Sequence, residues 1–289
     1  MVKKTRKRIG GGLRPLVPDS RDFKLERLGG FFLEPKMPTK SFLVAEPKYI
    51  RDQGSDDSCT SRAISTSLEK SEGVRISEEF QFAKTKQLEG SIEQWGADPR
   101  LAVKVPVKVG ALEKKFSPYT FSKDGRDFVS DWRNYDSVLD VNARFHKQKS
   151  FFRADDRPGT KDYFDSIILS LWQNREFKRT APFGIDWYGR WNFSTTGVIE
   201  KVPENESKIG HMVEALGLEV SPISKKLHLV VQNSSGTGWG DNGVGYFSRE
   251  AINTGARYGA FQFIDLTDEQ LARILYPCFV KRLWKDIFN

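Results

Sequence analysis

The chain has 289 residues, with 46 Lys or Arg against 38 Asp or Glu, so its formal net charge is +8. A chain of this length buries a substantial core as one large domain or two smaller ones. Its 38% hydrophobic and 29% charged residues exclude a disordered tail and a low-complexity repeat. The two cysteines, Cys59 and Cys278, are too few for a secreted-type disulfide framework or a Cys-rich zinc site.

The excess of basic charge is concentrated at the N-terminus. Residues 1–15 contain six basic residues and no acidic one, which leaves 40 basic against 38 acidic residues in the rest of the chain. A short basic cluster followed by Gly10, Gly11 and Gly12 predicts a flexible arm. Contact with nucleic acid or another anionic surface is therefore expected only through residues 3–14, and a solvated terminus is the simpler interpretation.

The sequence contains no segment that predicts contact with a membrane. No apolar run approaches the roughly 18 residues that a spanning helix needs, and the N-terminus lacks the apolar segment of a signal peptide. The low cysteine content is typical of a reducing compartment. We therefore expect the protein in the cytoplasm, or associated with a virus particle or another assembly.

Helical patterns dominate the first half of the chain. Residues 16–47 are rich in Pro and turn residues and predict an extended segment that crosses a domain surface. Residues 61–70 carry apolar side chains at helical spacing, and Gly73 is expected to end that helix. A second helix is expected to begin after Ser77, a favourable N-cap residue.

Strands are expected mainly in the second half. A third helical pattern over residues 98–115 contains Pro106, which predicts that this helix is broken or begins late. Amphipathic patterns predict further helices over residues 162–173 and 267–275. Strand-like runs separated by Gly, Asn and Pro loops lie at residues 181–188, 227–232, 244–248 and 258–264. Helices first and strands later indicate an α+β protein with two unlike halves.

Three chemically active residues stand at the boundaries of predicted elements. Cys59 precedes the first helix, where unpaired N–H groups and the positive end of the helix dipole favour a thiolate. His211 begins a strand-like run 152 residues after Cys59, and Asn233 ends another strand before a Gly-rich turn. Each residue alone has an ordinary explanation, since buried cysteines, core histidines and turn asparagines are common.

Together with Gln53, six residues before Cys59, these residues resemble the papain-like cysteine peptidases. The spacing from Cys59 to His211 is close to that family's roughly 130–150 residues, and a Gly-Trp-Gly-x-Asn-Gly stretch follows Asn233. The similarity is greatest to the bacterial-type branch without a large propeptide, and it covers roughly residues 16–265. That branch's successive blocks are matched by Asp52-Gln53-Gly54, Ser58-Cys59-Thr60, Ile76-Ser77-Glu78 with Phe80, Gly96-Ala97, Ser117-Pro118-Tyr119 and Thr195-Thr196-Gly197-Val198-Ile199.

The resemblance implies a papain-like two-domain fold of the α+β class, with the active site in the cleft between the domains. The mainly helical left domain is expected over residues 48–160, and the mainly β, barrel-like right domain over residues 161–265. Residues 16–47 are expected to pack on the right domain. Residues 266–289 are expected to form a C-terminal helical extension.

The resemblance also implies a role for each candidate catalytic residue. Cys59 is the expected nucleophile, His211 the general base and acid, and Asn233 the group that orients the imidazole. The Gln53 side chain and the Cys59 backbone N–H are the expected donors to the oxyanion. No metal or other cofactor is expected, and the two remaining histidines, His146 and His228, are interpreted as structural.

The groove that would hold the substrate is also implied by the resemblance. Gly96 is expected to pair with the substrate backbone, because glycine permits close approach. Trp95, Ala97 and Met212 are expected to line the groove, although Trp95 is equally well explained as a surface-packed aromatic. Trp239 is expected to shield the Asn–His hydrogen bond from water.

Departures from the family pattern bear on activity and processing. Thr60 and Asp56 stand where relatives have a tryptophan and a disulfide-forming cysteine, and Ser235 replaces another shielding tryptophan. Asp56 and Asp57 place negative charge before the nucleophile, which opposes the thiolate or selects basic substrates. The short N-terminal region predicts either no zymogen or a short autoinhibitory arm that ends near Pro18.

The leading hypothesis is a cysteine-type endopeptidase that cleaves peptide or protein substrates through a thioester acyl-enzyme. Two alternatives stay open: a weak or inactive papain-fold protein with a binding or structural role, and a Cys–His acyl transferase or amidase. A nucleic-acid binder is least favoured, because the body lacks a basic stripe with interleaved aromatics. The C-terminal tail, with Phe279, Trp284 and Phe288, is a candidate for docking into a larger assembly, although packing on the body is simpler.

Overall fold

The computed structural model describes residues 12–14, 16, 37–90, 94–117, 137–155 and 162–264. The α-helices in this part are α1 (Cys59–Glu72), α2 (Glu78–Glu89), α3 (Pro99–Lys108), α5 (Ser137–Ala143), α6 (Tyr163–Gln173) and α7 (Arg249–Gly255). The strands are β1 (Phe42–Leu43), β2 (Ser150–Arg153), β3 (Ala181–Tyr188), β4 (Val198–Ile199), β5 (Lys208–Val220), β6 (Leu227–Gln232), β7 (Val244–Phe247) and β8 (Ala256–Ile264). Short 3-10 helices are η2 (Lys114–Phe116), η4 (Arg144–His146), η5 (Arg175–Phe177) and η6 (Gly189–Phe193).

Local sequence signals explain where the first helices begin and end. Helix α1 ends at Gly73, which has a φ of 75° and donates its N–H to the carbonyl of Glu69. Helix α2 begins after Ser77, whose side chain accepts the N–H of Phe80. Both helices are therefore confirmed, with α1 two residues longer at each end than the predicted pattern over residues 61–70.

Helix α3 corrects the expectation for Pro106. It begins at Pro99, capped by Asp98, and continues through Pro106 to Lys108. A proline inside a helix leaves the carbonyl four residues earlier without its usual donor. Here the Gln81 side chain donates to that carbonyl, on Ala102, at 2.8 Å. The proline is tolerated because a neighbouring helix supplies the missing hydrogen bond.

The strands form one sheet in the order β2-β8-β3-β5-β6-β7-β4, with β1 paired to β5. All these pairings are antiparallel except that of β4 with β7. The predicted runs at residues 181–188 and 227–232 match β3 and β6. The α+β class is confirmed, but the described strands form an open sheet whose path ends at β2 and β4, rather than a closed barrel.

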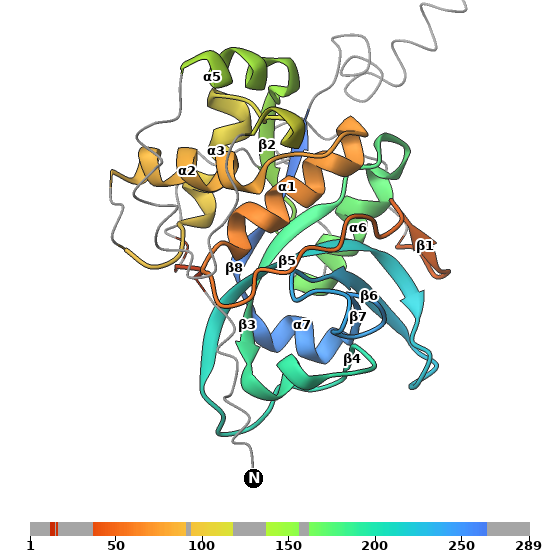
Figure 1. Cartoon of the computed structure of the whole chain (residues 1–289). Coiled ribbons are helices and arrows are strands. Elements are labelled where there is room, and N and C mark those ends of the chain that lie inside the picture. The colour runs from red at the N-terminus through yellow and green to blue at the C-terminus, as the bar shows by residue number, and fades with distance from the viewer. Residues whose placement is uncertain are drawn as a thin grey trace, which may run out of the picture.

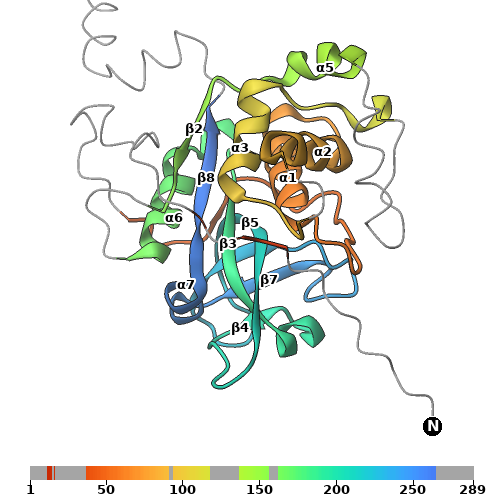
Figure 2. The same cartoon turned by 90° about the vertical axis from the view of Figure 1, so that its left-hand side faces the viewer.

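Helices cover both faces of this sheet. Figure 1 shows α1, α2, α3 and α5 gathered above the strands, and Figure 2 shows β2 and β8 running between these helices and α6. The larger core joins the sheet to α6 and α7, with Ile168 and Ile252 among its members. A second core lies between α1, α3 and the sheet, and it includes Cys59, Met212 and Phe261. Cys59 therefore lies at the junction between the helices and the sheet.

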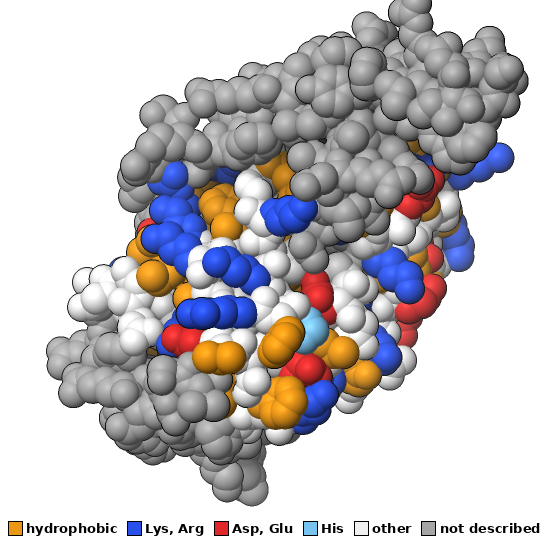
Figure 3. All heavy atoms as spheres, turned by 90° about the horizontal axis from the view of Figure 1, so that it is seen from above, with side chains coloured by type: hydrophobic (Ala, Val, Ile, Leu, Met, Phe, Trp, Pro, Cys, Tyr) orange, Lys and Arg blue, Asp and Glu red, His pale blue; other side chains and the backbone are white. Residues whose placement is uncertain are grey.

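The surface above the helices carries charges of both signs. On the face shown in Figure 3, Lys and Arg side chains are frequent but are interspersed with hydrophobic and acidic ones. In the described part of the chain, no helix is long and apolar enough to cross a membrane.

Several predicted segments lie outside the described residues. They include most of the basic arm, most of the extended segment over residues 16–47, and the whole C-terminal extension with Cys278 and the aromatic tail. The predicted domain boundaries stay a prediction. Within the described part, the helices α1, α2, α3 and α5 precede residue 144, whereas β2 at Ser150–Arg153 already belongs to the sheet.

Candidate active site

Cys59 is the first residue of α1 and is fully buried. The backbone N–H groups of Gly12 and Met212 donate to its sulfur, and these two bonds favour the thiolate. Burial nevertheless raises the pKa of the Cys59 thiol above its ordinary value. With this burial, the sulfur is therefore protonated at neutral pH.

His211 lies on β5 and contacts Asn233, which follows β6. The His211 Nε2 lies 2.8 Å from the Asn233 Oδ1, and both side chains are buried. The Asn233 amide nitrogen donates to the Ser235 hydroxyl at 3.0 Å, which turns the amide oxygen toward the histidine. Nε2 therefore carries the proton, and Nδ1 is left to accept one. Burial lowers the pKa of His211 to about 4, although the Asn233 bond acts to raise it.

A tryptophan that the sequence analysis did not single out shields this pair. The Trp187 ring lies 4.7 Å from the His211 ring, centroid to centroid, in an edge-on arrangement. The predicted shield, Trp239, packs behind it at 5.7 Å from Trp187 and donates its indole N–H to the Trp191 carbonyl. The only signal in the sequence was that Trp187 lies next to the end of a predicted strand, so the contact depends on how β3 pairs with β5.

Gln53 connects the loop before Cys59 to the loop that holds Asn233. Its side-chain amide donates to the Asp56 carbonyl at 2.9 Å and accepts the Ser234 hydroxyl at 2.5 Å. Its backbone N–H also donates to the Ser234 carbonyl at 2.8 Å. The structure thus brings Gln53 and Asn233 to one place, although they are far apart in sequence.

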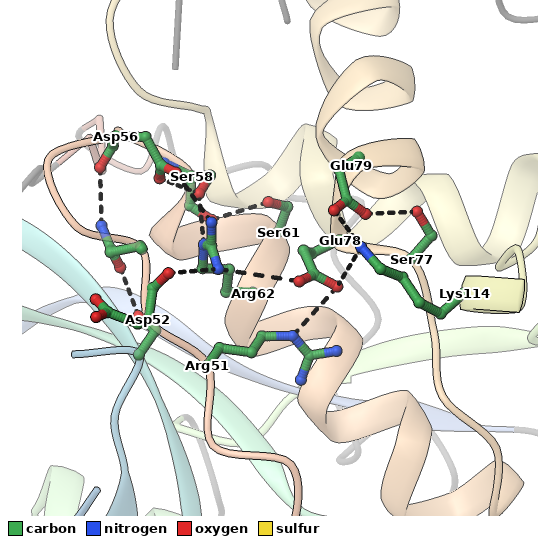
Figure 4. Close-up of polar contacts among 12 residues, drawn as sticks. Arg51, Asp52, Asp56, Ser58, Ser61, Arg62, Ser77, Glu78, Glu79 and Lys114 are labelled. Carbon is green, nitrogen blue, oxygen red and sulfur yellow. Dashed lines mark hydrogen bonds and ion pairs between the residues drawn. The ribbon is translucent and has the colours of Figure 1, made fainter. Parts of the chain in front are cut away.

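Charged side chains from α1 hold the loop before Cys59 (Figure 4). The Asp56 carboxylate accepts the Ser58 N–H at 3.1 Å and pairs with the Arg62 guanidinium at 2.9 Å. Arg62 also donates to the Ser58 hydroxyl at 2.7 Å and to the Asp52 carbonyl at 3.2 Å. Asp56 is therefore occupied inside the loop. It stands where relatives carry a disulfide-forming cysteine, and the ion pair constrains the same turn.

A second layer of the same network ties α1 to α2. Arg51 pairs with Glu69 of α1 at 2.6 Å. It also lies 3.4 Å from Glu78 of α2, which in turn lies 3.9 Å from Arg62 (Figure 4). Lys114 pairs with both Glu78 and Glu79. The opposite charges lie close together, although Arg51 Nε and Glu78 Oε2 make no hydrogen bond among the described residues, and they connect the base of the Cys59 loop to both helices.

The predicted groove residues surround a segment of the chain's own N-terminal region. The Ala97 N–H donates to the Gly12 carbonyl at 2.6 Å, and the Arg14 N–H donates to the Ala97 carbonyl at 3.2 Å. The Leu13 N–H donates to the Gly210 carbonyl at 3.3 Å. These last residues of the predicted flexible arm therefore form a strand-like segment, which we call the groove segment (residues 12–14).

Gly96 and Met212 contact the groove segment, whereas Trp95 lies at its margin. Gly96 has a φ of 71°, and a Cβ there would collide with the Gly12 carbonyl. Met212 belongs with Leu13 to the buried cluster that contains Cys59. Trp95 is 53% exposed. Of the four predicted groove residues, Gly96, Ala97 and Met212 are thus brought together around the segment.

The described residues contain no group of three or more His, Cys, Asp or Glu side chains that is placed to hold a metal ion. His146 pairs with Glu72 at 2.9 Å, and the Nε2 of His228 lies 3.1 Å from Glu200. These contacts are ion pairs and hydrogen bonds of ordinary structural type. Cys59 shares a buried cluster with Met212, the residue after His211, and the His211 Nδ1 has no hydrogen-bond partner among the described residues.

Known proteins match this chain in structure, whereas the comparisons by sequence found no match. No family model matches the chain, and no curated protein matches it. Among solved structures, it is similar to xylellain, a cysteine protease from Xylella fastidiosa, with a TM-score of 0.70 and 22% identity over 92% of this chain and 100% of that one. Procathepsin L 3 of Tenebrio molitor is similar with a TM-score of 0.58 and 17% identity, over 90% of this chain and 76% of that one. Bromelain from Ananas comosus is similar with a TM-score of 0.55 and 15% identity, over 78% of this chain and 99% of that one.

These similarities establish that the chain has the fold of papain-like cysteine proteases. The resemblance found in the sequence is therefore confirmed at the level of the fold.

Proposed function

We propose that the protein is a papain-like cysteine endopeptidase. The observation that carries the proposal is the position of Cys59, which starts α1 and shares a buried cluster with Met212, the residue after His211. His211 is paired with Asn233, and the backbone of Ala97 binds an extended segment of the chain. A thiol, an imidazole with a fixed tautomer and an edge for an extended chain are the parts that thiol-dependent cleavage of a peptide bond requires.

The proposed mechanism follows from these positions. His211 Nδ1 takes the proton of Cys59, and the thiolate attacks the carbonyl carbon of the substrate to form a tetrahedral oxyanion. Gln53 and the Cys59 backbone N–H donate to that oxyanion, and loss of one such donor costs on the order of 10²–10³ in rate. His211 then protonates the leaving amine. A water molecule, deprotonated by His211, releases the acyl group from Cys59.

The position of the groove segment supports a closed state of this site. The groove segment presents the Gly12 N–H to the sulfur instead of a carbonyl carbon, so it is bound without being in position for attack. Its Leu13 belongs to the buried cluster of Cys59, and burial raises the pKa of Cys59 and lowers that of His211. When the segment leaves and water enters, both shifts are expected to weaken, which favours the thiolate and imidazolium pair.

The test uses the full chain with Leu13→Asp, which places a carboxylate in an apolar site and should release the groove segment. This variant should cleave denatured protein substrates, and iodoacetamide should alkylate Cys59 at mildly acidic pH faster than in the wild type. Cys278→Ala is the matched control and should keep both properties, whereas Cys59→Ala and His211→Ala should lose them. An accessible Cys59 that reacts no faster than Cys278, with no cleavage, would instead favour a papain-fold protein without turnover.

A further inference from the structure

The side chain of Arg14 is bound by two acceptors at the edge of the groove. One guanidinium nitrogen lies 2.5 Å from the Glu89 carboxylate, and another donates to the side-chain carbonyl of Gln94. Because the Arg14 N–H also bonds to Ala97, the backbone and the side chain of this residue are both fixed. A planar guanidinium that meets two acceptors in this way is a specific form of recognition.

The surroundings of Glu89 favour a cation. Its side chain is only 2% exposed, and it is the last residue of α2, where the helix dipole is negative. The same carboxylate accepts the Asp98 N–H at 2.7 Å and pairs with Lys86 at 3.2 Å.

Lys86 does not balance the negative charge at this edge of the groove. Its ammonium also donates to the carbonyls of Gln94 and Gly96, and Gly96 in turn donates its N–H to the Asp57 carboxylate. The charges of Glu89 and Asp57 both act to raise the pKa of Lys86 against its burial, so two carboxylates stand near this one lysine. Arg14 supplies the second positive charge, and its departure leaves the carboxylate of Glu89 ready for another cation.

The backbone pairing sets the place of this cluster relative to the sulfur. The residues of the groove segment follow one another away from the Cys59 sulfur. Gly12 lies at the sulfur, Leu13 pairs with Ala97, and Arg14 binds Glu89. A substrate with its attacked carbonyl at the sulfur would run in the opposite direction along the same edge. The side chain of the third residue before its cleaved bond would then reach Glu89.

We propose that Glu89 and Gln94 form a subsite for a basic side chain, which Arg14 fills in the closed state and an Arg or Lys of the substrate fills during cleavage. The inference rests on the proposed peptidase function for its substrate part, and on the observed contacts of Arg14 for its binding part.

The binding part is tested without turnover. The full-length triple variant Cys59→Ala, Leu13→Asp, Arg14→Gln has a released groove segment and no nucleophile. A fluorescent heptapeptide with the sequence of residues 10–16 is titrated into it by anisotropy, beside versions with Gln or Glu in place of the arginine. The arginine peptide should bind at least about tenfold more tightly than the Gln peptide, as a charge-assisted pair predicts. Equal affinities would overturn the subsite.

Adding Glu89→Gln should abolish this preference, while the amide still accepts the Asp98 N–H. Glu206→Gln is the matched control, since Glu206 pairs with Arg190 at 2.7 Å outside the groove, and it should leave the preference intact. If Glu89→Gln does not fold, Gln94→Ala removes the other acceptor and should reduce the preference in the same direction.

The substrate part is tested by cleavage. With Cys59 restored, the released variant is given peptides that carry Arg, Gln or Glu three residues before the cleaved bond. Faster cleavage of the peptide with Arg three residues before the cleaved bond, lost in Glu89→Gln, supports the proposal. Cleavage without that preference overturns the substrate part. Tight binding of the arginine peptide with no cleavage of any peptide overturns the peptidase function and leaves Glu89 as a site for basic ligands.

Discussion

Ser235 decides which end of the Asn233 amide faces His211. The Ser235 hydroxyl accepts a hydrogen bond from the amide N–H of Asn233, so the amide oxygen faces the imidazole Nε2 of His211. In the sequence, Ser235 stands out as the loss of a shielding tryptophan. In the structure, the shield is supplied by Trp187 from the neighbouring strand, and Ser235 orients Asn233. The replacement therefore does not expose the Asn–His hydrogen bond, because Asn233 and His211 remain buried.

Asn233→Ala is predicted to weaken both stability and reactivity. It leaves the buried Nε2–H of His211 without its acceptor, which should lower the free energy of unfolding by about 1–3 kcal/mol. In the Leu13→Asp background, the rate of Cys59 alkylation should fall on the order of tenfold or more, because the imidazole loses its fixed tautomer. Ser235→Ala is the comparison and should give smaller losses of both. Urea unfolding and alkylation kinetics measure the two effects, and an unchanged alkylation rate in Asn233→Ala would contradict the orienting role.

The order of Gln53, Cys59, His211 and Asn233 along the chain was enough to nominate His211 and Asn233, which are in contact, and Gln53, which bonds to Ser234 beside Asn233. Sequence spacing was not enough to find Trp187 or Arg62. Trp187 reaches His211 only through the register of β3 on β5. Arg62 belongs to a helix whose apolar pattern gave no sign that this position faces a buried loop.

At the level of elements, the loop before α1 is held in place by a side chain of α1 itself, that of Arg62. Ser58 is the N-cap residue, but it makes no side-chain capping bond to the helix. Its hydroxyl instead meets Asp56 and Arg62, one turn into α1. The position of Cys59 is therefore fixed by the Asp56–Arg62 pair, in place of the disulfide that the sequence lacks.

Arg62→Met is predicted to be strongly destabilising. It leaves the buried Asp56 carboxylate without its guanidinium, and removal of one partner of a buried ion pair costs about 3–5 kcal/mol. Arg75→Met is the matched control, because Arg75 also pairs with a buried carboxylate, that of Glu69, but is 38% exposed. Its loss should cost about 1 kcal/mol or less. Urea unfolding midpoints compare the two, and equal losses would show that the Arg62 pair has no special role.

Elements with continuous burial were predicted well, and interrupted ones were not. Every residue of β3 is buried, and its predicted bounds match. Strand β5 was recognised only as a strand-like run beginning near His211, because Gly210, Glu214 and Gly217 interrupt its apolar character. The register of β5 on β6 also shifts between Ala215 and Gly217. A bulge in a long central strand removes the alternation on which a sequence pattern depends.

At the level of the whole molecule, the site depends on contacts between segments that are far apart in the chain. The groove segment lies against the loop of Gly96 on one side and against β5 on the other. The basic composition of residues 1–15 predicts a flexible arm, but no local pattern reveals that residues 12–14 pair with Ala97 and Gly210. Long-range pairing of this kind is decided by the assembled surface, which exists only once the helices and the sheet have met.

Glu214 is a buried carboxyl group at the junction between α1 and the sheet. It lies on β5 and is almost fully buried. Burial raises the pKa of the Glu214 carboxyl well above its ordinary value of 4.5, while the hydroxyls of Thr180 and Ser67 and the charge of Lys70 on α1 lower it by less. The folded protein therefore holds this proton at a pH where the unfolded chain has released it.

The consequence is a loss of stability as the pH rises. Above about pH 4.5 the unfolded state gains by losing the Glu214 proton and the folded state does not, so the contribution falls by about 1.4 kcal/mol per pH unit until the folded group titrates. Glu214→Gln removes this term, so its unfolding midpoint in urea should exceed that of the wild type at about pH 7 by more than at about pH 5. Glu176→Gln, at a carboxylate whose side chain is 78% exposed, is the matched control and should follow the wild type. A constant difference between Glu214→Gln and the wild type across this range would mean that Glu214 is ionised in the folded protein and that the junction accommodates its charge.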